Sequence, residues 1–306
     1  MKRALAFLLI TTVAVTAQTK GGPTWTDPDK ASEENADFLV QGEYRRADTG
    51  YQVIALGKGQ FHVSVYQGGL PGAGWDESTI AQERGDTAAI KKLIDGADRI
   101  ERKSPSLGKE PAEGAIVLFD GKNADAWKGG KITEGFLESG SQTKQTFGDF
   151  EMHVEFRLPF KPETTPSSQD RGNSGIYIQN RYETQVLDSF GLDLDRKAWK
   201  EKPESDSKQW CGCLYKFKLA DTNMCLPPLR WQTYDITFTA ARFEGEKKVK
   251  NARITVIHNG VKIHDDVELP KGTGVGGTRE EIPKGPIVLQ GHGNPVRYRN
   301  IWLKEL

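Results

Sequence analysis

The chain has 306 residues, and its 42 Lys and Arg residues balance its 42 Asp and Glu residues. A chain without excess basic charge gives no reason to expect a nucleic-acid partner or binding to an anionic membrane surface. Its 33 glycines and 15 prolines are typical of a β protein with many turns. The length suits two domains, or one large β domain with an appendage.

The first 17 residues have the features of an export signal. Lys2 and Arg3 precede an apolar run that is too short to cross a bilayer comfortably, and small residues follow near Ala17. We therefore expect residues 1–17 to be a signal peptide, the mature protein to be secreted or periplasmic, and no integral membrane segment after cleavage. An uncleaved membrane anchor is the alternative. Residues 18–36 are polar and predict a flexible lead-in.

Residues 37–105 predict a small accessory domain of strands and one helix. Apolar and polar residues alternate from Phe61 to Tyr66, after a Gly-Lys-Gly sequence that suits a hairpin turn. Apolar residues then recur near helical spacing, which predicts a helix over 87–102. The Pro- and Gly-containing segment 103–111 predicts a linker. Nothing in this region indicates its purpose.

Residues 112–306 predict strands and no long helix. In 150–158, Met152 and Val154 would share one face of a strand, and His153 and Glu155 the other. Many antiparallel strands in succession predict a mainly β fold, a two-sheet antiparallel jelly-roll sandwich. The expected strands are 115–119, 150–158, 174–179, 182–188, 231–239, 252–258, 261–268, 286–290 and 296–304.

The stretch "GNSGIYIQNRYETQVLDS", residues 172–189, places polar side chains on two strands that should build a core. Its alternation directs Ile176 and Ile178 towards the core. Asp188 has the wrong parity for the opposite face unless a β-bulge near Leu187 resets the phase. With that bulge, the spacing would resemble the acidic signature of jelly-roll β-glucan hydrolases, with a neutral Gln in the middle. The residues expected to share a sugar-binding groove are Asn173, Tyr177, Gln179, Glu183 and Gln185.

Six motifs in order resemble the 3-keto-disaccharide hydrolase domain family over about residues 112–306. The resemblance implies a concanavalin-like jelly roll, exported carbohydrate chemistry and an upstream sugar 3-oxidoreductase as a functional partner. The motifs are "LFDGKNADAW" (118–127), "GDFEMHVEFR" (148–157), the 172–189 stretch, "WQTYDITFTAARF" (231–243), "VIHNGVKIHDD" (256–266) and "GPIVLQGHGNPVRYRNIW" (285–302).

Three cysteines suit one disulfide and one free thiol in an oxidising compartment, with a metal site as the alternative. The family resemblance includes a Cys-Gly-x-x-Tyr…Asn-Met-Cys-x-Pro-Pro arrangement. It implies a disulfide between Cys211 and Cys225 and leaves Cys213 free.

The mechanism of glycoside cleavage depends on how many carboxylates lie close together. Retaining glycosidases hold two carboxyl groups roughly 5–5.5 Å apart and inverting ones roughly 6.5–9.5 Å apart. The neutral Gln185 gives that mechanism little support. The resemblance implies another route, in which a 3-ketone acidifies the C2 proton, one base removes it, the C1 substituent leaves by elimination, and water adds. A divalent metal ion could take the place of hydrogen-bond donors at the enolate oxygen.

The candidate residues follow from these requirements. The candidate catalytic bases are Glu183, His153 and His292. The candidate substrate-binding residues are Arg171, Asn173, Tyr177, Gln179, Gln185, Asp188 and Gln290. Each has a structural alternative: His153 could belong to a solvated strand face, and His292 could cap a turn.

Two other functions remain open at this point. One is a conventional glycoside hydrolase that acts on unoxidised glycan. The other is a non-catalytic carbohydrate-binding protein, for which Trp127, Trp199, Trp210 and Tyr182 could serve as stacking platforms.

Overall fold

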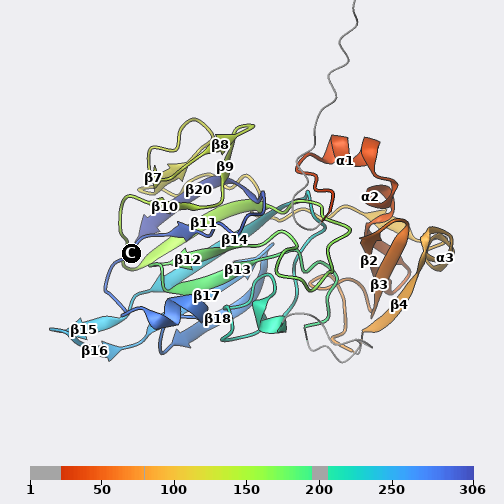
Figure 1. Cartoon of the computed structure of the whole chain (residues 1–306). Helices are drawn as coiled ribbons and strands as arrows, with labels where there is room; N and C mark the ends of the chain where they lie inside the picture. The colour runs from red at the N-terminus through yellow and green to blue at the C-terminus, as the bar shows by residue number, and fades with distance from the viewer. Residues whose placement is uncertain (1–21, 79, 195–205) are drawn as a thin grey trace, which may run out of the picture.

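The computed structural model of the chain describes residues 22–78, 80–194 and 206–306 (Figure 1). The predicted signal peptide lies outside these residues. In the described ranges, no helix is long and apolar enough to cross a membrane.

The accessory domain has one five-stranded antiparallel sheet in the order β4-β3-β2-β1-β5. The predicted helix over 87–102 is shorter than expected, because Gly96 adopts a φ of 70° and the chain then pairs with β1 as a strand. The elements are β1 (Gly42–Arg46), β2 (Thr49–Gly57), β3 (Gln60–Gln67), β4 (Ala81–Asp86), α3 (Thr87–Leu93) and β5 (Asp98–Ile100).

The described part of the predicted flexible lead-in is folded. It contains α1 (Pro28–Glu34), and α2 (Ala36–Val40) follows it. The Asp27 side chain accepts a hydrogen bond from the Lys30 backbone N–H, and Pro28 opens the helix, a combination that favours helix initiation despite the polar composition. Trp25 exchanges backbone hydrogen bonds with Phe160 of the jelly roll.

The remainder of the chain forms a β-sandwich, as predicted. Its larger sheet has the order β18-β17-β14-β11-β20-β9-β8, with β6 paired to β20, and its smaller sheet has the order β13-β12-β19-β10-β7. The strands are β6 (Ile116–Phe119), β7 (Trp127–Lys128), β8 (Ile132–Thr133), β9 (Phe136–Glu138), β10 (Ser141–Thr143), β11 (Phe150–Arg157), β12 (Ser174–Ile178), β13 (Tyr182–Val186), β14 (Trp231–Thr239), β15 (Arg242–Glu244), β16 (Lys247–Lys250), β17 (Ala252–His258), β18 (Val261–Leu269), β19 (Val288–Leu289) and β20 (Arg297–Glu305), with 3-10 turns η1 (Ser207–Gln209) and η2 (Gly274–Thr278).

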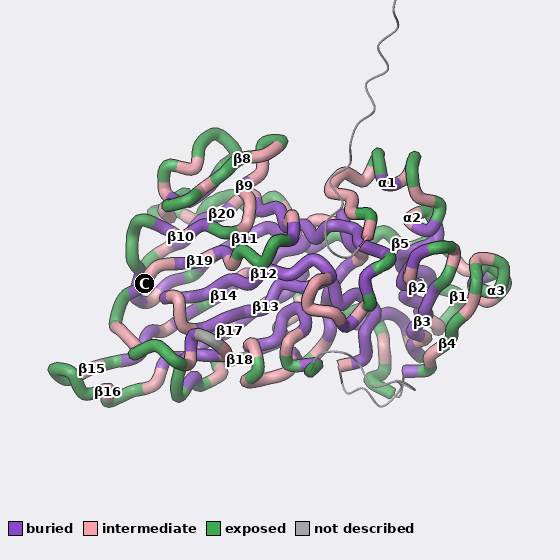
Figure 2. Tube along the Cα trace, in the orientation of Figure 1, coloured by how far each residue is buried: buried purple, intermediate pink, exposed green. Residues whose placement is uncertain are grey.

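The two sheets pack face to face on one core. Ile176 and Leu289 from the smaller sheet join Val154 and Ile236 from the larger sheet in this cluster. Ile54 of the accessory domain belongs to the same cluster, so the two domains pack closely (Figure 1). Every residue of β12 and β13 is buried (Figure 2). The polar outer face of these two strands is therefore covered as well as the core face.

Candidate active site

The strand register defines one polar face on the smaller sheet. Tyr177 lies directly opposite Glu183, and Gly175 directly opposite Gln185. The Gln290 backbone N–H donates to the Gly175 carbonyl at 2.8 Å, which places Gln290, directly after β19, beside Gly175. Because opposite residues of antiparallel strands point to the same face, these side chains project together.

Behind this face, Ile176, Ile178 and Val186 belong to the core cluster, as the alternation predicted. Asn173 has the parity of Tyr177 and stands at the start of the same face.

The Glu183 carboxylate occupies a notch that only glycine leaves open. A Cβ atom at Gly175 would lie 2.2 Å from Glu183 Oε1, so the carboxylate folds over the glycine Cα. Glu183 is 1% exposed, and neither of its carboxylate oxygens has a hydrogen-bond partner among the described residues. A buried carboxylate without partners is costly for a folded protein, which makes it a candidate functional group.

Burial raises the pKa of Glu183 to about 7. The nearby Tyr177 hydroxyl and the Lys216 charge lower the pKa, but they do not offset the loss of solvation. The Tyr177 hydroxyl interacts with the carboxylate without meeting the geometry of a good hydrogen bond. Glu183 can therefore gain and lose a proton near neutral pH, as a general base requires.

The amide side chains on this face offer further unpartnered acceptors. Asn173 Nδ2 donates to the Gln169 carbonyl at 2.8 Å, and Gln185 Nε2 donates to the Gln209 carbonyl at 3.0 Å. Asn173 Oδ1 and Gln290 Oε1 are buried and have no partner among the described residues. Most buried polar atoms in proteins are hydrogen-bonded, so this group of acceptors is typical of a site for a ligand rich in hydroxyl donors.

A cavity of about 460 Å³ adjoins this face and contains Tyr177 and Gln290 in its lining. The lining residues are Lys128, Gly140, Ser141, Gln142, Tyr177, Asn180, Arg279, Val288, Leu289, Gln290 and Gly291. They include two cationic side chains and no carboxylate, which suits a ligand that develops negative charge.

Arg171 and Asp188 lie elsewhere, in a buried ion pair. Arg171 Nε donates to Asp188 Oδ2 at 2.8 Å, and Arg171 Nη2 donates to the Ala55 carbonyl of the accessory domain at 3.1 Å. The β12–β13 register has no shift and β13 ends at Val186, so no bulge places Asp188 on the polar face. Both groups are engaged in linking the sheet to the accessory domain, not in the site.

Two further predicted residues do not join the polar face. Gln179 lies at the turn after β12, where its Nε2 donates to the carbonyls of Phe147 and Pro283 at 3.1 and 3.2 Å. It therefore ties loops together. His292 lies in an exposed loop two residues after Gln290 and is not among the residues that line the cavity. Its carbonyl accepts a hydrogen bond from Asn294.

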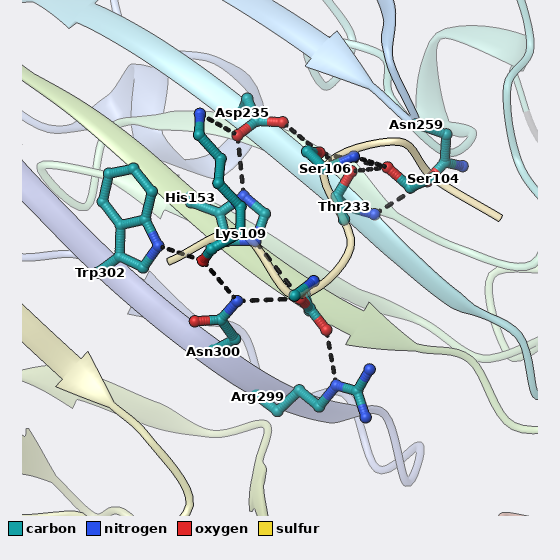
Figure 3. A network of polar contacts seen from close by, with 12 residues as sticks. Ser104, Ser106, Lys109, His153, Thr233, Asp235, Asn259, Arg299, Asn300 and Trp302 are labelled. Carbon is teal, nitrogen blue, oxygen red and sulfur yellow. Dashed lines mark hydrogen bonds and ion pairs between the residues drawn. The ribbon is translucent and has the colours of Figure 1, made fainter. Parts of the chain in front are cut away.

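His153 is separated from Glu183 by the sandwich core. It lies on the outer face of the larger sheet, where its Nδ1 is 2.8 Å from Asp235 Oδ1 and its ring stacks on Trp302 (Figure 3). The linker covers this face: Ser106 Oγ donates to Asp235 at 2.6 Å, and the Gly108 N–H donates to Glu155 at 2.6 Å. His153 is fully buried beneath the linker, so it is neither a solvated strand residue nor a base for this site.

The charges around His153 balance one another. Burial lowers the pKa of His153, but Asp235 and Glu155 outweigh that effect and raise it. Burial raises the pKa of Glu155, but its contacts with His153, Asn300, the Gly108 N–H and Arg299 outweigh that effect and lower it to about 2. The cluster is therefore a compensated network that holds the linker on the sheet.

The disulfide between Cys211 and Cys225 that the family resemblance implies is not formed in the structure. Cys211, Cys213 and Cys225 are free and buried, although the Cys211 and Cys225 thiols interact.

The described part of the chain contains no ligand set for a divalent metal ion. No three His, Cys, Asp or Glu residues there are grouped to hold one. Glu183 is the one carboxylate among the strand residues of the polar face, so we derive no reaction step through a metal.

Several residues that complete the site lie outside the strands, in segments that the strand pattern did not single out. Gln169 and Gln209 anchor the amides of Asn173 and Gln185, and Arg279 reaches the cavity from the segment after η2. Arg279 Nη1 donates to the Asn180 carbonyl and side chain at 2.7 and 2.9 Å. Loops carry no periodicity, so the sequence offers no signal for these neighbours.

One solved structure that is similar to the chain agrees with this architecture. The chain is similar to a crystal structure of a candidate glycosyl hydrolase from Parabacteroides distasonis ATCC 8503, with 32% identity, a TM-score of 0.51, and coverage of 63% of this chain and 84% of that chain. A second candidate glycosyl hydrolase from that organism has 17% identity, a TM-score of 0.46, and coverage of 63% and 94%. No curated protein matches the chain significantly.

A family model described as the 3-keto-alpha-glucoside-1,2-lyase-like domain matches residues 114–304. Because this match spans more than half of the chain, the protein belongs to the family of that domain.

Proposed function

We propose that the protein cleaves glycosidic bonds of 3-keto-glycosides by deprotonation at C2, elimination of the C1 substituent and addition of water. The family and the similar glycosyl hydrolase structure support a carbohydrate-active function. The Glu183 carboxylate carries the proposal of keto-sugar chemistry, because it is buried, has a pKa of about 7 and has no hydrogen-bond partner among the described residues. The oxygens of Asn173 and Gln290 on the same face also lack partners there.

The chemistry needs one base and a stabilised enolate. A ketone at C3 makes the C2 proton acidic, and Glu183 accepts that proton. The electron pair moves to the C3 oxygen, where the positive charges of Lys128 and Arg279 in the cavity stabilise the developing enolate. Collapse of the enolate breaks the bond between C1 and its substituent, whose oxygen takes up the proton held by Glu183, and water then adds across the resulting C1–C2 double bond. The unpartnered oxygens of Asn173 and Gln290 accept hydrogen bonds from sugar hydroxyls and orient the ring.

A two-carboxylate glycosidase mechanism has less support. It requires a second carboxyl group within roughly 5–10 Å of the first. Along the strand residues of the polar face, the position directly beside Glu183 is Tyr177, and the next pair is Gly175 with Gln185. Single-base chemistry on an already oxidised sugar matches this residue set.

The setting of the reaction is also a proposal. The amino-terminal sequence favours export, and in an oxidising compartment the interacting thiols of Cys211 and Cys225 would form the disulfide that the family resemblance implies. The keto substrate requires a preceding sugar 3-oxidoreductase, which we propose as a functional partner.

The test compares wild-type protein with Glu183→Gln on a 3-keto-disaccharide and on its unoxidised parent, each with and without chelator. We expect wild type to cleave the keto sugar alone, and the variant to lose at least roughly a hundredfold in rate. Glu151→Gln, at an exposed position of β11, is the matched control and should keep full activity. Cleavage of the unoxidised parent, or full turnover by Glu183→Gln, would contradict the proposal.

A further inference from the structure

Tyr177 lies between the cavity and the Glu183 carboxylate. Tyr177 lines the cavity, whereas Glu183 does not and is 1% exposed against 5% for Tyr177. The two residues face each other across β12 and β13, so the phenol reaches both the cavity and the carboxylate. A sugar in the cavity therefore meets the phenol before it meets the carboxylate.

The Tyr177 hydroxyl is also free to act. It forms no hydrogen bond of good geometry among the described residues, yet it interacts with Glu183, whose two oxygens are likewise unpartnered. A second phenol near Glu183 differs in this respect, because Tyr215 donates its hydroxyl to Gln209 Oε1 at 2.9 Å and does not line the cavity. Tyr215 therefore serves as a matched control.

Resting on the proposed function, we propose that Tyr177 relays the proton between C2 of the keto sugar and Glu183. The C2–H bond breaks and its proton goes to Tyr177 Oη, while the Oη–H bond breaks and that proton goes to a Glu183 carboxylate oxygen. The C2 electron pair passes to the C3 oxygen as the enolate forms. Tyr177 ends the step as a neutral phenol, and Glu183 ends it as a neutral acid.

The pKa values of Tyr177 and Glu183 set the direction in which the proton moves. Burial and the Glu183 charge raise the pKa of Tyr177 well above its usual value, so the phenol does not store a negative charge. The pKa of Glu183, about 7, makes its carboxylate the stable acceptor behind the phenol. Tyr177 touches the substrate, and Glu183 acts through it.

The experiment measures deprotonation without cleavage. The probe is the 3-keto derivative of 1,5-anhydroglucitol, which has no glycosidic substituent at C1, incubated with the full chain in D2O. NMR follows deuterium entering at C2, and the C4 proton, which is also next to the ketone, is the internal reference. We expect wild type to accelerate exchange at C2, and Tyr177→Phe to lose at least roughly a hundredfold, falling to the level of Glu183→Gln.

The controls separate the relay from a structural effect. Tyr215→Phe should exchange at the wild-type rate, and Tyr177→Phe should bind the probe with unchanged affinity. On wild type, the relay predicts a normal solvent isotope effect on the removal of the C2 proton, because the Oη proton moves in the same step. This measurement needs no variant, so it holds even if Tyr177→Phe fails to fold.

The possible failures are distinguishable. Wild-type exchange in Tyr177→Phe, or no solvent isotope effect in wild type, would overturn the relay and leave Glu183 as the direct base. Exchange that survives in Glu183→Gln, or is absent in wild type, would remove the proposed function and the relay with it.

Discussion

The Glu183→Gln substitution removes a buried negative charge and keeps the size of the side chain, so it should affect stability and activity in opposite directions. The folded-state pKa of Glu183 is about 7, raised from an ordinary value of 4.5 by burial. The folded protein therefore holds this proton more tightly than the unfolded chain. Between these two pKa values the unfolded state is the more ionised, and the stability of wild type falls as the pH rises.

The magnitude follows from the size of the pKa shift. A rise from 4.5 to about 7 corresponds to about 3 kcal/mol, at about 1.4 kcal/mol for each pKa unit. Near pH 4 Glu183 is neutral in both states, so its ionisation contributes nothing to the free energy of unfolding. Near pH 8 the full cost of ionising Glu183 destabilises wild type, and Glu183→Gln does not have this cost. We expect the variant to gain up to about 3 kcal/mol over wild type between these two pH values.

Urea unfolding of both proteins near pH 4, 6 and 8 measures this difference. Subtracting the two curves removes the contributions of all other titrating groups. Turnover of a 3-keto-disaccharide by the same samples should show the loss of activity. A stability difference that does not change with pH would refute the view that Glu183 ionises at a cost to the fold.

Other contacts lead to predictions of different kinds. Gly175→Ala should lose roughly a hundredfold in turnover with little loss of stability, because its Cβ would lie 2.2 Å from Glu183 Oε1 and displace the carboxylate by about 1 Å. The control is Gly148→Ala, whose Cβ would make an ordinary 3.5 Å contact. Unaffected turnover in Gly175→Ala would contradict the notch. Arg171→Met leaves the buried Asp188 carboxylate unpaired and should lower the free energy of unfolding by about 3–5 kcal/mol in urea, whereas a change well under about 1 kcal/mol would argue against a structural ion pair. The raised pKa of His153 means that its contribution to stability is full below an ordinary pKa of 6.5 and is lost as the pH rises through the folded value. His153→Gln should therefore flatten the decline of stability above about pH 6 and leave turnover unchanged, and an unaltered slope in urea unfolding would count against the network.

The sequence predicted the polar face because alternation along a strand leaves little freedom. Once Ile176 and Ile178 of one strand and Val186 of the next are assigned to the core, Tyr177 and Glu183 must lie on the opposite face. The long strands were found by the same signal, and β14 and β17 have the expected bounds. Strands β7 to β10 and β15 to β16 have two to four residues each, too few for an alternating pattern to stand out.

Alternation identifies a face but does not reveal what covers it. His153, like Glu183, lies on the strand face opposite the apolar residues, yet the linker covers that face. This packing depends on residues almost fifty positions earlier in the chain. The position of Arg171 likewise depends on a carbonyl of the accessory domain, Ala55, more than a hundred residues away. Long-range contacts of this kind have no periodic signature, so sequence patterns grouped residues that the fold separates.

Glu183 differs from the buried charges of Arg171 and His153 because those charges are compensated by an opposite charge in contact. Arg171 faces Asp188 at 2.8 Å, and His153 faces Asp235 at 2.8 Å, so each buried charge there has an opposite charge in contact. Such pairs hold elements together and leave no bonding capacity for a substrate. Glu183 has no such partner among the residues that the structure describes, and the chain keeps a glycine opposite Gln185 to make room for it. A protein retains an uncompensated buried carboxylate at a cost to its stability, and proton transfer to a bound sugar is a function that such a carboxylate can perform.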